Sequence, residues 1–351
     1  MISKHNFEKE YIEQQIKKYP NIDITKLEMT IFAFGLLDEL VKCDIPLIFK
    51  GGTSLLLLFN KPYRLSTDID IIVPPDFDFD KTFEKVKTNF PFYEGEERGN
   101  ISNKHFRHFY FSFYGPISKK ECRINLDVSF EKNPYPNTLL KEIKTPFIET
   151  IGVKTFVKIP THESILGDKL TAFAPTTIGV NPFMTSLGKP INNRLQVIKQ
   201  FYDIAKLYEY INNIDDVLNS YKTCQEFENE FRNANYTLKD TLLDTFNHAA
   251  EIASMGLWNK KSNFYNDVAQ PGIQGIATNI FDGKYNQLLA SIDASKIMFL
   301  AATLLSKIII RKDSSSCLIN KQLKAFKAIP DKDSFVLIKK SLEMMNELQL
   351  L

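Results

Sequence analysis

The chain has 351 residues, of which 44% are hydrophobic and 25% are charged. These proportions match an average globular protein, so extensive disorder is excluded. Forty-four Lys and Arg residues against 42 Asp and Glu residues give a formal net charge of +2. This small charge excludes a protein that coats nucleic acid through its overall charge, and any basic surface must be local.

The sequence gives no signal for export, membrane insertion or disulfide formation. Residues 1–8 carry charges where a signal peptide needs an apolar stretch. The longest strongly apolar run, residues 297–305, is shorter than the roughly 20 residues that span a bilayer. No Cys-x-x-Cys pair occurs, which argues against a structural zinc site. The scattered cysteines are Cys43, Cys122, Cys224 and Cys317. We therefore expect a soluble cytoplasmic protein with no membrane partner.

The first part of the chain predicts helices that alternate with short strands. Apolar residues recur at helical spacing through most of residues 1–45. The elements predicted next, in chain order, are a strand at 45–49, a helix at 53–59, a strand at 67–73, a helix at 80–89, and strands at 105–114 and 122–130. Thr53 is the predicted N-cap of the helix at 53–59 because its hydroxyl can accept from a first-turn amide.

The rest of the chain is predicted to be helical. Residues 161–173 predict a helix, and a loop rich in Pro, Gly, Thr and Asn follows at 175–193. The helices predicted beyond it cover residues 195–212, 214–221, 224–233, 237–254, 283–311, 317–328 and 334–349. We therefore predict an α+β fold, with a mixed sheet flanked by helices over residues 1–190 and an all-helical domain over residues 191–351.

Two aspartates on one predicted strand form the first candidate site. Side chains alternate faces along a strand, so Asp68 and Asp70 point the same way, about 7 Å apart. Two carboxylates on one face repel each other, and a divalent cation between them relieves that repulsion. Ligands that are all oxygen suit Mg²⁺ or Mn²⁺.

A candidate phosphate-binding turn lies just upstream. Gly51 and Gly52 allow the backbone to approach a ligand closely, and the start of the next helix offers amide groups to a phosphate. Thr53 and Ser54 add hydroxyl groups. A phosphate cradle beside a pair of metal-binding carboxylates is what phosphoryl or nucleotidyl transfer requires.

A third carboxylate comes from the predicted strand at 122–130. Ile124, Leu126 and Val128 fall on one face of this strand, so Asn125 and Asp127 fall on the other. Asp127 is therefore a candidate metal ligand or general base. The alternative is a surface acid on an exposed sheet face.

These residues carry a resemblance to a known family. Two segments separated by a spacer resemble the polymerase-β-type nucleotidyltransferase superfamily, and within it the AbiEii/AbiGii toxins of bacterial toxin–antitoxin and abortive-infection systems. They are Lys50-Gly-Gly-Thr-Ser and Arg64-Leu-Ser-Thr-Asp-Ile-Asp-Ile. Two later segments resemble further motifs of that family. They are Glu163-Ser-Ile-Leu-Gly-Asp-Lys-Leu and Lys199-Gln-Phe-Tyr-Asp-Ile-Ala-Lys-Leu, where Gln200 replaces an acid.

The resemblance implies an activity and a role for each matching residue. Residues 1–190 would form a nucleotidyltransferase-like catalytic domain that moves a nucleoside monophosphate from an NTP to an acceptor, with Mg²⁺ or Mn²⁺ as cofactor. The acceptor would be RNA, such as tRNA, and an antitoxin would restrain the enzyme. Asp68 and Asp70 would hold the metals, with Asp127 possible as a third ligand. The residues implied to grip the triphosphate are Gly51, Gly52, Thr53, Ser54, Arg64, Ser66 and Lys169. Asp203 would position Lys169 or the acceptor.

Alternatives remain for several of these residues. Lys169 lies near an apolar helix stripe and is otherwise a lysine that extends from a core helix. Asp203 has lysines one turn before and after it, so the alternative to a catalytic role is an ion pair within its helix. For Arg64 the alternative is an ion pair at the rim of the site. His105 and His108 fall on opposite faces of one strand, and we interpret both as packing residues.

The acceptor is also open. A group of basic residues late in the chain could hold an RNA backbone, or it could be a solvated helix face. The group consists of Lys321, Lys324 and Lys327 on one side of a helix, with Lys307, Arg311 and Lys312 nearby. An aminoglycoside-type enzyme would use the same core on a small hydroxylated substrate. A non-catalytic module would bind a nucleotide or a partner without turnover.

Overall fold

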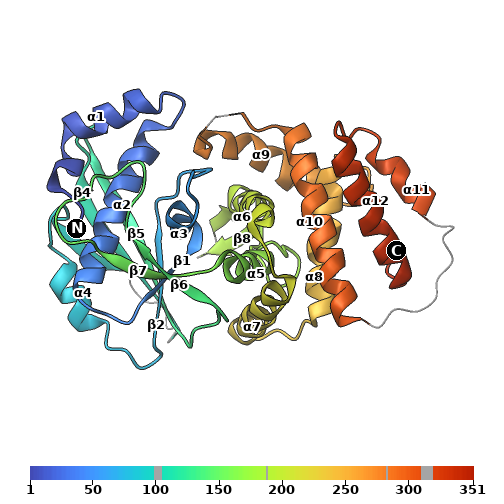
Figure 1. Cartoon of the computed structure of the whole chain (residues 1–351), viewed down its shortest axis with the longest axis horizontal. Coiled ribbons are helices and arrows are strands. Elements are labelled where there is room, and N and C mark those ends of the chain that lie inside the picture. Colours follow the sequence, from blue (N-terminus) through green and yellow to red (C-terminus); the bar gives the residue numbers. More distant parts are fainter. Residues whose placement is uncertain (99–104, 187–188, 282–283, 310–318) are drawn as a thin grey trace. The chain divides into compact units, whose positions relative to one another are not determined.

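The computed structural model describes residues 1–98, 105–186, 189–281, 284–309 and 319–351. The chain forms two compact units (Figure 1). The first unit contains Met1–Thr161 and Thr278–Gly283, and the second contains His162–Ala277 and Lys284–Leu351. The predicted division at residue 190 stays a prediction.

A mixed sheet with the strand order β3-β4-β5-β2-β1-β7-β6 forms the centre of the first unit. β2 and β5 run parallel, as do β1 and β7, and the other neighbouring strands are antiparallel. The strands are β1 (Ile48–Lys50), β2 (Ile69–Val73), β3 (Glu94–Glu97), β4 (Phe106–Tyr114), β5 (Glu121–Phe130), β6 (Thr138–Glu142) and β7 (Phe156–Pro160). The predicted mixed sheet of an α+β fold is therefore confirmed.

The helices described in the first unit are α1 (Lys9–Lys18), α2 (Ile24–Lys42), α3 (Gly51–Leu58) and α4 (Asp80–Val86). α2 begins after Asp23, whose carboxylate accepts a hydrogen bond from the Lys26 amide at 2.9 Å. α2 packs against β2 and β5, and α3 packs against β1, β2 and β6. These helices flank the sheet (Figure 1).

One face of the central strands is apolar and fully covered. Alternation places Phe109, Phe111 and Phe113 of β4 on this face, and all three are completely buried. Phe32 of α2 stacks on Phe113 with 3.7 Å between ring centroids, and Phe79 lies 5.2 Å from Phe109. Because this face forms the core, the polar residues of the same strands point to the opposite face.

A segment from late in the chain completes the first unit. The Leu65 amide donates to the Asn279 carbonyl at 2.8 Å, and the Phe281 amide donates to the Tyr63 carbonyl at 3.2 Å. Phe281 also stacks on Phe147, with 5.2 Å between ring centroids. Residues 278–281 therefore pair with the stretch that leads into β2.

Within its described residues, the second unit is helical apart from one hairpin, β8 (Phe183–Ser186) and β9 (Lys189–Asn192). Its described helices are α5 (His162–Ala172), α6 (Arg194–Leu207), α7 (Ile214–Arg232), α8 (Leu238–Ala253), α9 (Gln270–Ile276), α10 (Gln287–Ile308), α11 (Ile319–Leu323) and α12 (Lys332–Glu347). A π-helical turn, Tyr265–Ala269, leads into α9. The predicted series of helices after the sheet is thus confirmed.

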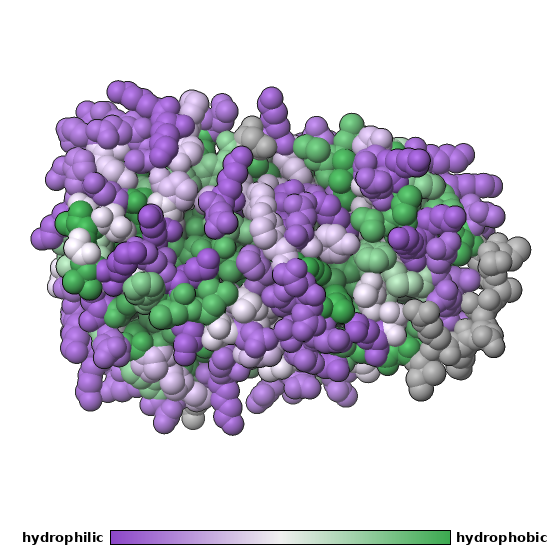
Figure 2. Space-filling view, viewed as in Figure 1, coloured by the Kyte–Doolittle hydropathy of each residue, from purple (hydrophilic) through white to green (hydrophobic). Residues whose placement is uncertain are grey.

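α10 is the centre of the second unit. It packs against α6, α8 and α12. By length and composition alone it is also the one described helix that could cross a membrane, but 67% of its apolar window is buried. Burial of α10 to this extent is expected for the core helix of a compact unit. The visible face in Figure 2 is mostly hydrophilic, with hydrophobic residues in separate patches.

Several predicted elements differ from the structure. The expected loop at 175–193 contains the β8–β9 hairpin, and the helices expected at 214–221 and 224–233 are the single helix α7. The sequence patterns did not reveal β3, β6, β7 or α9. Residues 310–318, which include the expected start of a helix at 317, Arg311, Lys312 and Cys317, lie outside the described residues.

Candidate functional site

A row of polar residues crosses four neighbouring strands of the sheet. Lys50 of β1 is the register partner of Asp70 of β2, Asp70 is the partner of Asp127 of β5, and Asp127 is the partner of His108 of β4. Register partners point to the same face of a sheet, and neighbouring strands lie about 4.8 Å apart. All four residues are half-buried. The sheet therefore brings together two aspartates that are far apart in the sequence.

Asp68 joins this row from the residue before β2. It lies two residues before Asp70 and accepts a hydrogen bond from Asn125 Nδ2 at 3.0 Å. Asn125 itself lies two residues before Asp127 on β5. The sheet thus gathers the three predicted acids, Asp68, Asp70 and Asp127, on one polar face, as their alternation predicts.

The turn between β1 and α3 is built against Asp70. Gly51 begins α3 with φ = +75°, a conformation that L side chains rarely adopt. A Cβ placed on Gly51 would lie 1.9 Å from Asp70 Oδ2. Glycine is therefore required at this position both for the backbone conformation and for the space that Asp70 occupies. The start of α3 lies directly beside the acids.

Gly52 makes a second close approach, to Arg64 and Ser66. A Cβ on Gly52 would lie 2.7 Å from Arg64 Nη2 and 2.9 Å from Ser66 Oγ. Arg64 is only 6% exposed, and its Nη1 donates to the Leu65 carbonyl at 3.0 Å. Arg64 is thus a buried residue at the glycine turn, and the alternative of a rim position is wrong.

Thr53 and Ser54 stabilise the turn through their hydroxyl groups. Thr53 Oγ1 donates to the Asp68 carbonyl at 2.5 Å, and Ser54 Oγ donates to the Gly51 carbonyl at 2.8 Å. Both side chains are buried. The expectation that Thr53 caps the helix is wrong, because α3 begins at Gly51 and Lys50 is the cap residue. A direct contact of either hydroxyl with a nucleotide stays a prediction.

His108 is a site residue that the sequence patterns did not identify. Its Nδ1 lies 2.6 Å from Asp127 Oδ1. This hydrogen bond raises the pKa of His108; burial opposes the shift and the negative charge of Asp127 adds to it. The interpretation of His108 as a packing residue is therefore wrong. Only the β4–β5 register, which no local pattern fixes, could have revealed the pair.

Lys169 and Asp203 form a buried ion pair inside the second unit. Lys169 Nζ of α5 lies 3.1 Å from Asp203 Oδ2 of α6, and their side chains are 6% and 2% exposed. Lys169 also donates to Gln200 Oε1 at 2.8 Å. A neighbouring lysine, Lys206, pairs instead with Asp293 at 3.4 Å. Lys169 therefore connects the motif on α5 with the motif on α6.

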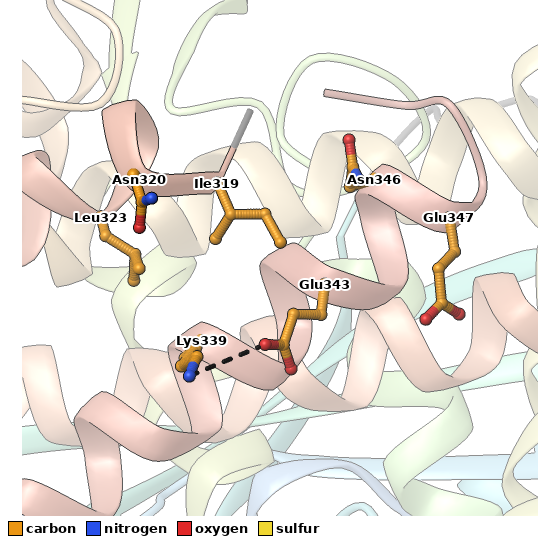
Figure 3. Close-up of a pocket in the computed structure, with 7 residues that line it drawn as sticks. All are labelled: Ile319, Asn320, Leu323, Lys339, Glu343, Asn346 and Glu347. Atoms are coloured by element: carbon orange, nitrogen blue, oxygen red, sulfur yellow. Dashed lines mark ion pairs between the residues drawn. The ribbon is translucent and has the colours of Figure 1, made fainter. Parts of the chain in front are cut away.

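Two cavities are lined by residues other than these. One, of about 350 Å³, is lined by residues of α11 and α12, including Lys339 and Glu343, which form an ion pair at 3.9 Å (Figure 3). Another, of about 380 Å³, lies in the first unit beside Phe7 and Phe90. Among the described residues, no three His, Cys, Asp or Glu side chains are gathered as a ready-made metal site.

Comparison with known proteins identifies the family. The description "Nucleotidyl transferase AbiEii toxin, Type IV TA system" matches residues 36–278. No curated protein matches the chain significantly. The fold is similar to that of MenT4, a nucleotidyltransferase toxin from Mycobacterium tuberculosis, at 13% identity and a TM-score of 0.48, covering 91% of this chain and 94% of that one. It is also similar to JHP933 from Helicobacter pylori, at 13% identity and a TM-score of 0.45, covering 80% and 94%. The chain therefore belongs to the AbiEii family of nucleotidyltransferase toxins of type IV toxin–antitoxin systems, and it is a nucleotidyltransferase.

Proposed function

We propose that this enzyme transfers a nucleoside monophosphate from an NTP to an RNA acceptor, such as tRNA, in a reaction that depends on Mg²⁺ or Mn²⁺. One observation supports the proposal most strongly. Asp68, Asp70 and Asp127 share one sheet face, and the glycine turn that starts α3 packs directly against Asp70. Carboxylates beside a helix start combine ligands for a cation with amide groups for a phosphate.

The acids fit a cation that is bound together with the nucleotide. Mg²⁺ in nucleotide enzymes is commonly held by one or two carboxylates, with substrate phosphates and water as its other ligands. Asp68 and Asp70 supply two such carboxylates, so a complete cluster of protein ligands is not required. A bound Mg²⁺ would neutralise the triphosphate charge and make the α-phosphorus easier to attack.

The chain's own residues then perform the remaining tasks. The amide groups at the start of α3 and the Arg64 guanidinium bind the triphosphate, with Ser66 beside them. The acceptor hydroxyl oxygen attacks the α-phosphorus, and the bond from that phosphorus to the bridging oxygen breaks, so pyrophosphate leaves. Asp127 is a third ligand or the base that takes the hydroxyl proton. Lys169 serves the same reaction as a phosphate contact, and Asp203 positions it.

The family supports a biological setting for the proposal. A toxin of a type IV toxin–antitoxin system implies a cognate antitoxin. We assign the enzyme to the cytoplasm and its toxicity to an abortive-infection response. An RNA acceptor is consistent with the exposed lysines Lys321, Lys324 and Lys327, which are suited to contact phosphates.

A labelling experiment tests the reaction. Wild-type protein is incubated with Mg²⁺, total RNA and each α-labelled NTP in turn, and RNA is separated on a gel. The matched variants are Asp68→Asn/Asp70→Asn and, as a control, Asp76→Asn, which changes an exposed aspartate beyond β2. We expect labelled RNA with wild type and with Asp76→Asn, and a loss of at least about 1,000-fold with the double variant.

Two outcomes would contradict the proposal. Full labelling by the double variant would exclude Asp68 and Asp70 from catalysis. Label that enters an aminoglycoside mixture but never RNA would exclude the RNA acceptor and favour a small hydroxylated substrate. A parallel incubation with γ-labelled NTP separates the two transfer reactions, because only phosphoryl transfer moves the γ-label to the acceptor.

A further inference from the structure

We propose that His108 is a positioning residue, which holds Asp127 so that one carboxylate oxygen stays directed to the ligand. This inference rests on the proposed function of Asp127. His108 and Asp127 are register partners on β4 and β5, and His108 Nδ1 lies 2.6 Å from Asp127 Oδ1. The hydrogen bond occupies Oδ1 and leaves Oδ2 available on the same polar face.

Because His108 and Asp70 lie on opposite sides of Asp127, the hydrogen bond from His108 restricts the orientation of the Asp127 carboxylate. Asp127 has β4 on one side and β2 on the other, so His108 and Asp70 are its neighbours in opposite directions. An aspartate in a strand can adopt several staggered rotamers. A donor from β4 selects the rotamer in which Oδ1 is held on the β4 side. The remaining oxygen is then the one left for a ligand beside Asp70, the register partner of Asp127 on β2.

This role does not depend on the charge of the imidazole. Nδ1 is a donor both in the imidazolium and in the neutral tautomer that carries its proton on Nδ1. His108 therefore acts as a fixed donor, and the carboxylate remains a ligand. Hydrogen bonds to ligating carboxylates commonly change metal affinity 10- to 100-fold when they are removed.

A comparable side-chain donor contacts Asp68, since Asn125 Nδ2 of β5 donates to Asp68 Oδ1 at 3.0 Å. At Asp70 the constraint is steric, because a Cβ on Gly51 would lie 1.9 Å from Asp70 Oδ2. Residues from neighbouring elements thus restrict both carboxylates. His108 differs from the other residues of this set because it comes from β4, a strand that carries none of the family motifs.

Direct binding of Mn²⁺ tests the proposal without turnover. The full-length chain is titrated with Mn²⁺ in the presence of a fixed concentration of a non-hydrolysable NTP analogue, and binding is followed by the enhancement of water-proton relaxation. The variants are His108→Phe, which removes the donor, and His108→Asn, whose amide can donate from nearly the Nδ1 position. His105→Phe is the matched control, because His105 is an exposed histidine directly before β4.

We expect His108→Phe to weaken Mn²⁺ binding at least about 10-fold, and His108→Asn to stay within about 3-fold of wild type. His105→Phe should bind as wild type does. In steady-state assays the Mg²⁺ concentration for half-maximal activity should rise for His108→Phe, while kcat at saturating Mg²⁺ changes less. Circular dichroism confirms folding, and His108→Ala replaces His108→Phe if the phenyl ring disrupts the sheet.

The outcomes separate this inference from the proposed function. Wild-type affinity in His108→Phe, with binding lost in Asp68→Asn/Asp70→Asn, would overturn the role of His108 and leave the proposed function intact. Equal weakening in His108→Asn and His108→Phe would overturn the donor role. Wild-type affinity in both Asp127→Asn and Asp68→Asn/Asp70→Asn would overturn the metal site itself.

Discussion

Gly51 carries the tightest steric constraint at the candidate site. Its φ of +75° costs an L residue roughly 1–2 kcal/mol, and a Cβ would also lie 1.9 Å from Asp70 Oδ2. The two effects can be separated, because Gly152 has a similar φ of +63° and nothing within 4 Å of an added Cβ. A comparison of the two positions therefore distinguishes backbone strain from displacement of the carboxylate.

We expect Gly51→Ala to reduce transferase activity at least about 100-fold, because Asp70 must move away from its position. Gly152→Ala should lower the free energy of unfolding by about 1 kcal/mol and leave activity within about 2-fold of wild type. Activity is measured with labelled NTP, and stability by urea unfolding. Comparable activity in the two variants would show that Asp70 tolerates displacement.

The Lys169–Asp203 pair permits a test that separates stability from function. Removing one partner of a buried ion pair typically costs about 3–5 kcal/mol, whereas replacing both by apolar residues is often neutral. We expect Lys169→Met and Asp203→Leu each to destabilise the protein strongly. The double variant should recover much of that stability but no activity. Recovery of activity along with stability would mean that the pair serves only the fold.

At the residue scale, alternation was sufficient to place the acids. Asp68 and Asp70 share a face because they are two residues apart in the extended segment at the start of β2, and the apolar neighbours of Asp127 fixed its face. His108 was not predictable in this way, because its role depends on which residue of β5 lies opposite it. Strand register arises from the whole sheet and is not encoded near His108.

At the scale of elements, a buried carboxylate of α8 holds the segment that leads to the β8–β9 hairpin. Asp244 Oδ2 accepts hydrogen bonds from the Thr176 amide at 2.9 Å and from the Thr177 hydroxyl at 2.8 Å. Its Oδ1 lies 2.8 Å from His248 Nδ1. Burial alone would raise the pKa of Asp244, but the contacts with His248 and the threonines outweigh it and lower the pKa.

His248 makes this contact sensitive to pH. Burial alone would lower the pKa of His248, but its hydrogen bond with Asp244 and the charge of Asp244 outweigh burial and raise it. Glu251, on the next turn of α8, adds a further negative charge beside the ring. Because the folded pKa is raised, the stabilisation is complete below the unfolded value of about 6.5 and is lost as pH rises through the folded value.

We therefore expect the free energy of unfolding of wild type to fall between pH 6 and pH 8.5 by more than that of His248→Gln. Urea unfolding followed by circular dichroism at several pH values measures this difference. His5→Gln is the control, since His5 is at the surface with its side chain 44% exposed. A pH dependence that is the same in wild type and His248→Gln would contradict the coupling.

The strands that the sequence patterns missed depend on a pairing partner and not on a pattern within the strand itself. Residues 175–193 have the composition of a loop, yet Met184 and Ile191 pair across the β8–β9 hairpin. β6 and β7 likewise form through pairing, because β6 pairs with β7 and β7 also pairs with β1. By contrast, α2, α8 and α12 each begin at a side chain that accepts a hydrogen bond from a first-turn amide, a local signal that sequence does encode.

At the scale of the whole molecule, the catalytic proposal predicts a stability that depends on ligands. Anything that binds only the folded state stabilises it, by about 2.7 kcal/mol when its concentration is 100 times its dissociation constant. We expect NTP with Mg²⁺ to raise the thermal unfolding temperature of wild type and to have little effect on Asp68→Asn/Asp70→Asn. Differential scanning fluorimetry measures this shift. An equal shift in both proteins would place nucleotide binding elsewhere.

The pairing of residues 278–281 with the stretch before β2 also constrains how the toxin is made. Translation runs from the N-terminus, so the ribosome has synthesised most of the chain before Asn279 and Phe281 exist to bind Leu65 and Tyr63. Arg64, which pairs with Ile280 in an antiparallel bridge, lies in this same stretch. A nascent chain or a product of premature termination before residue 278 lacks this pairing. The stretch that carries Arg64 therefore reaches its paired state only after residue 281 has been synthesised.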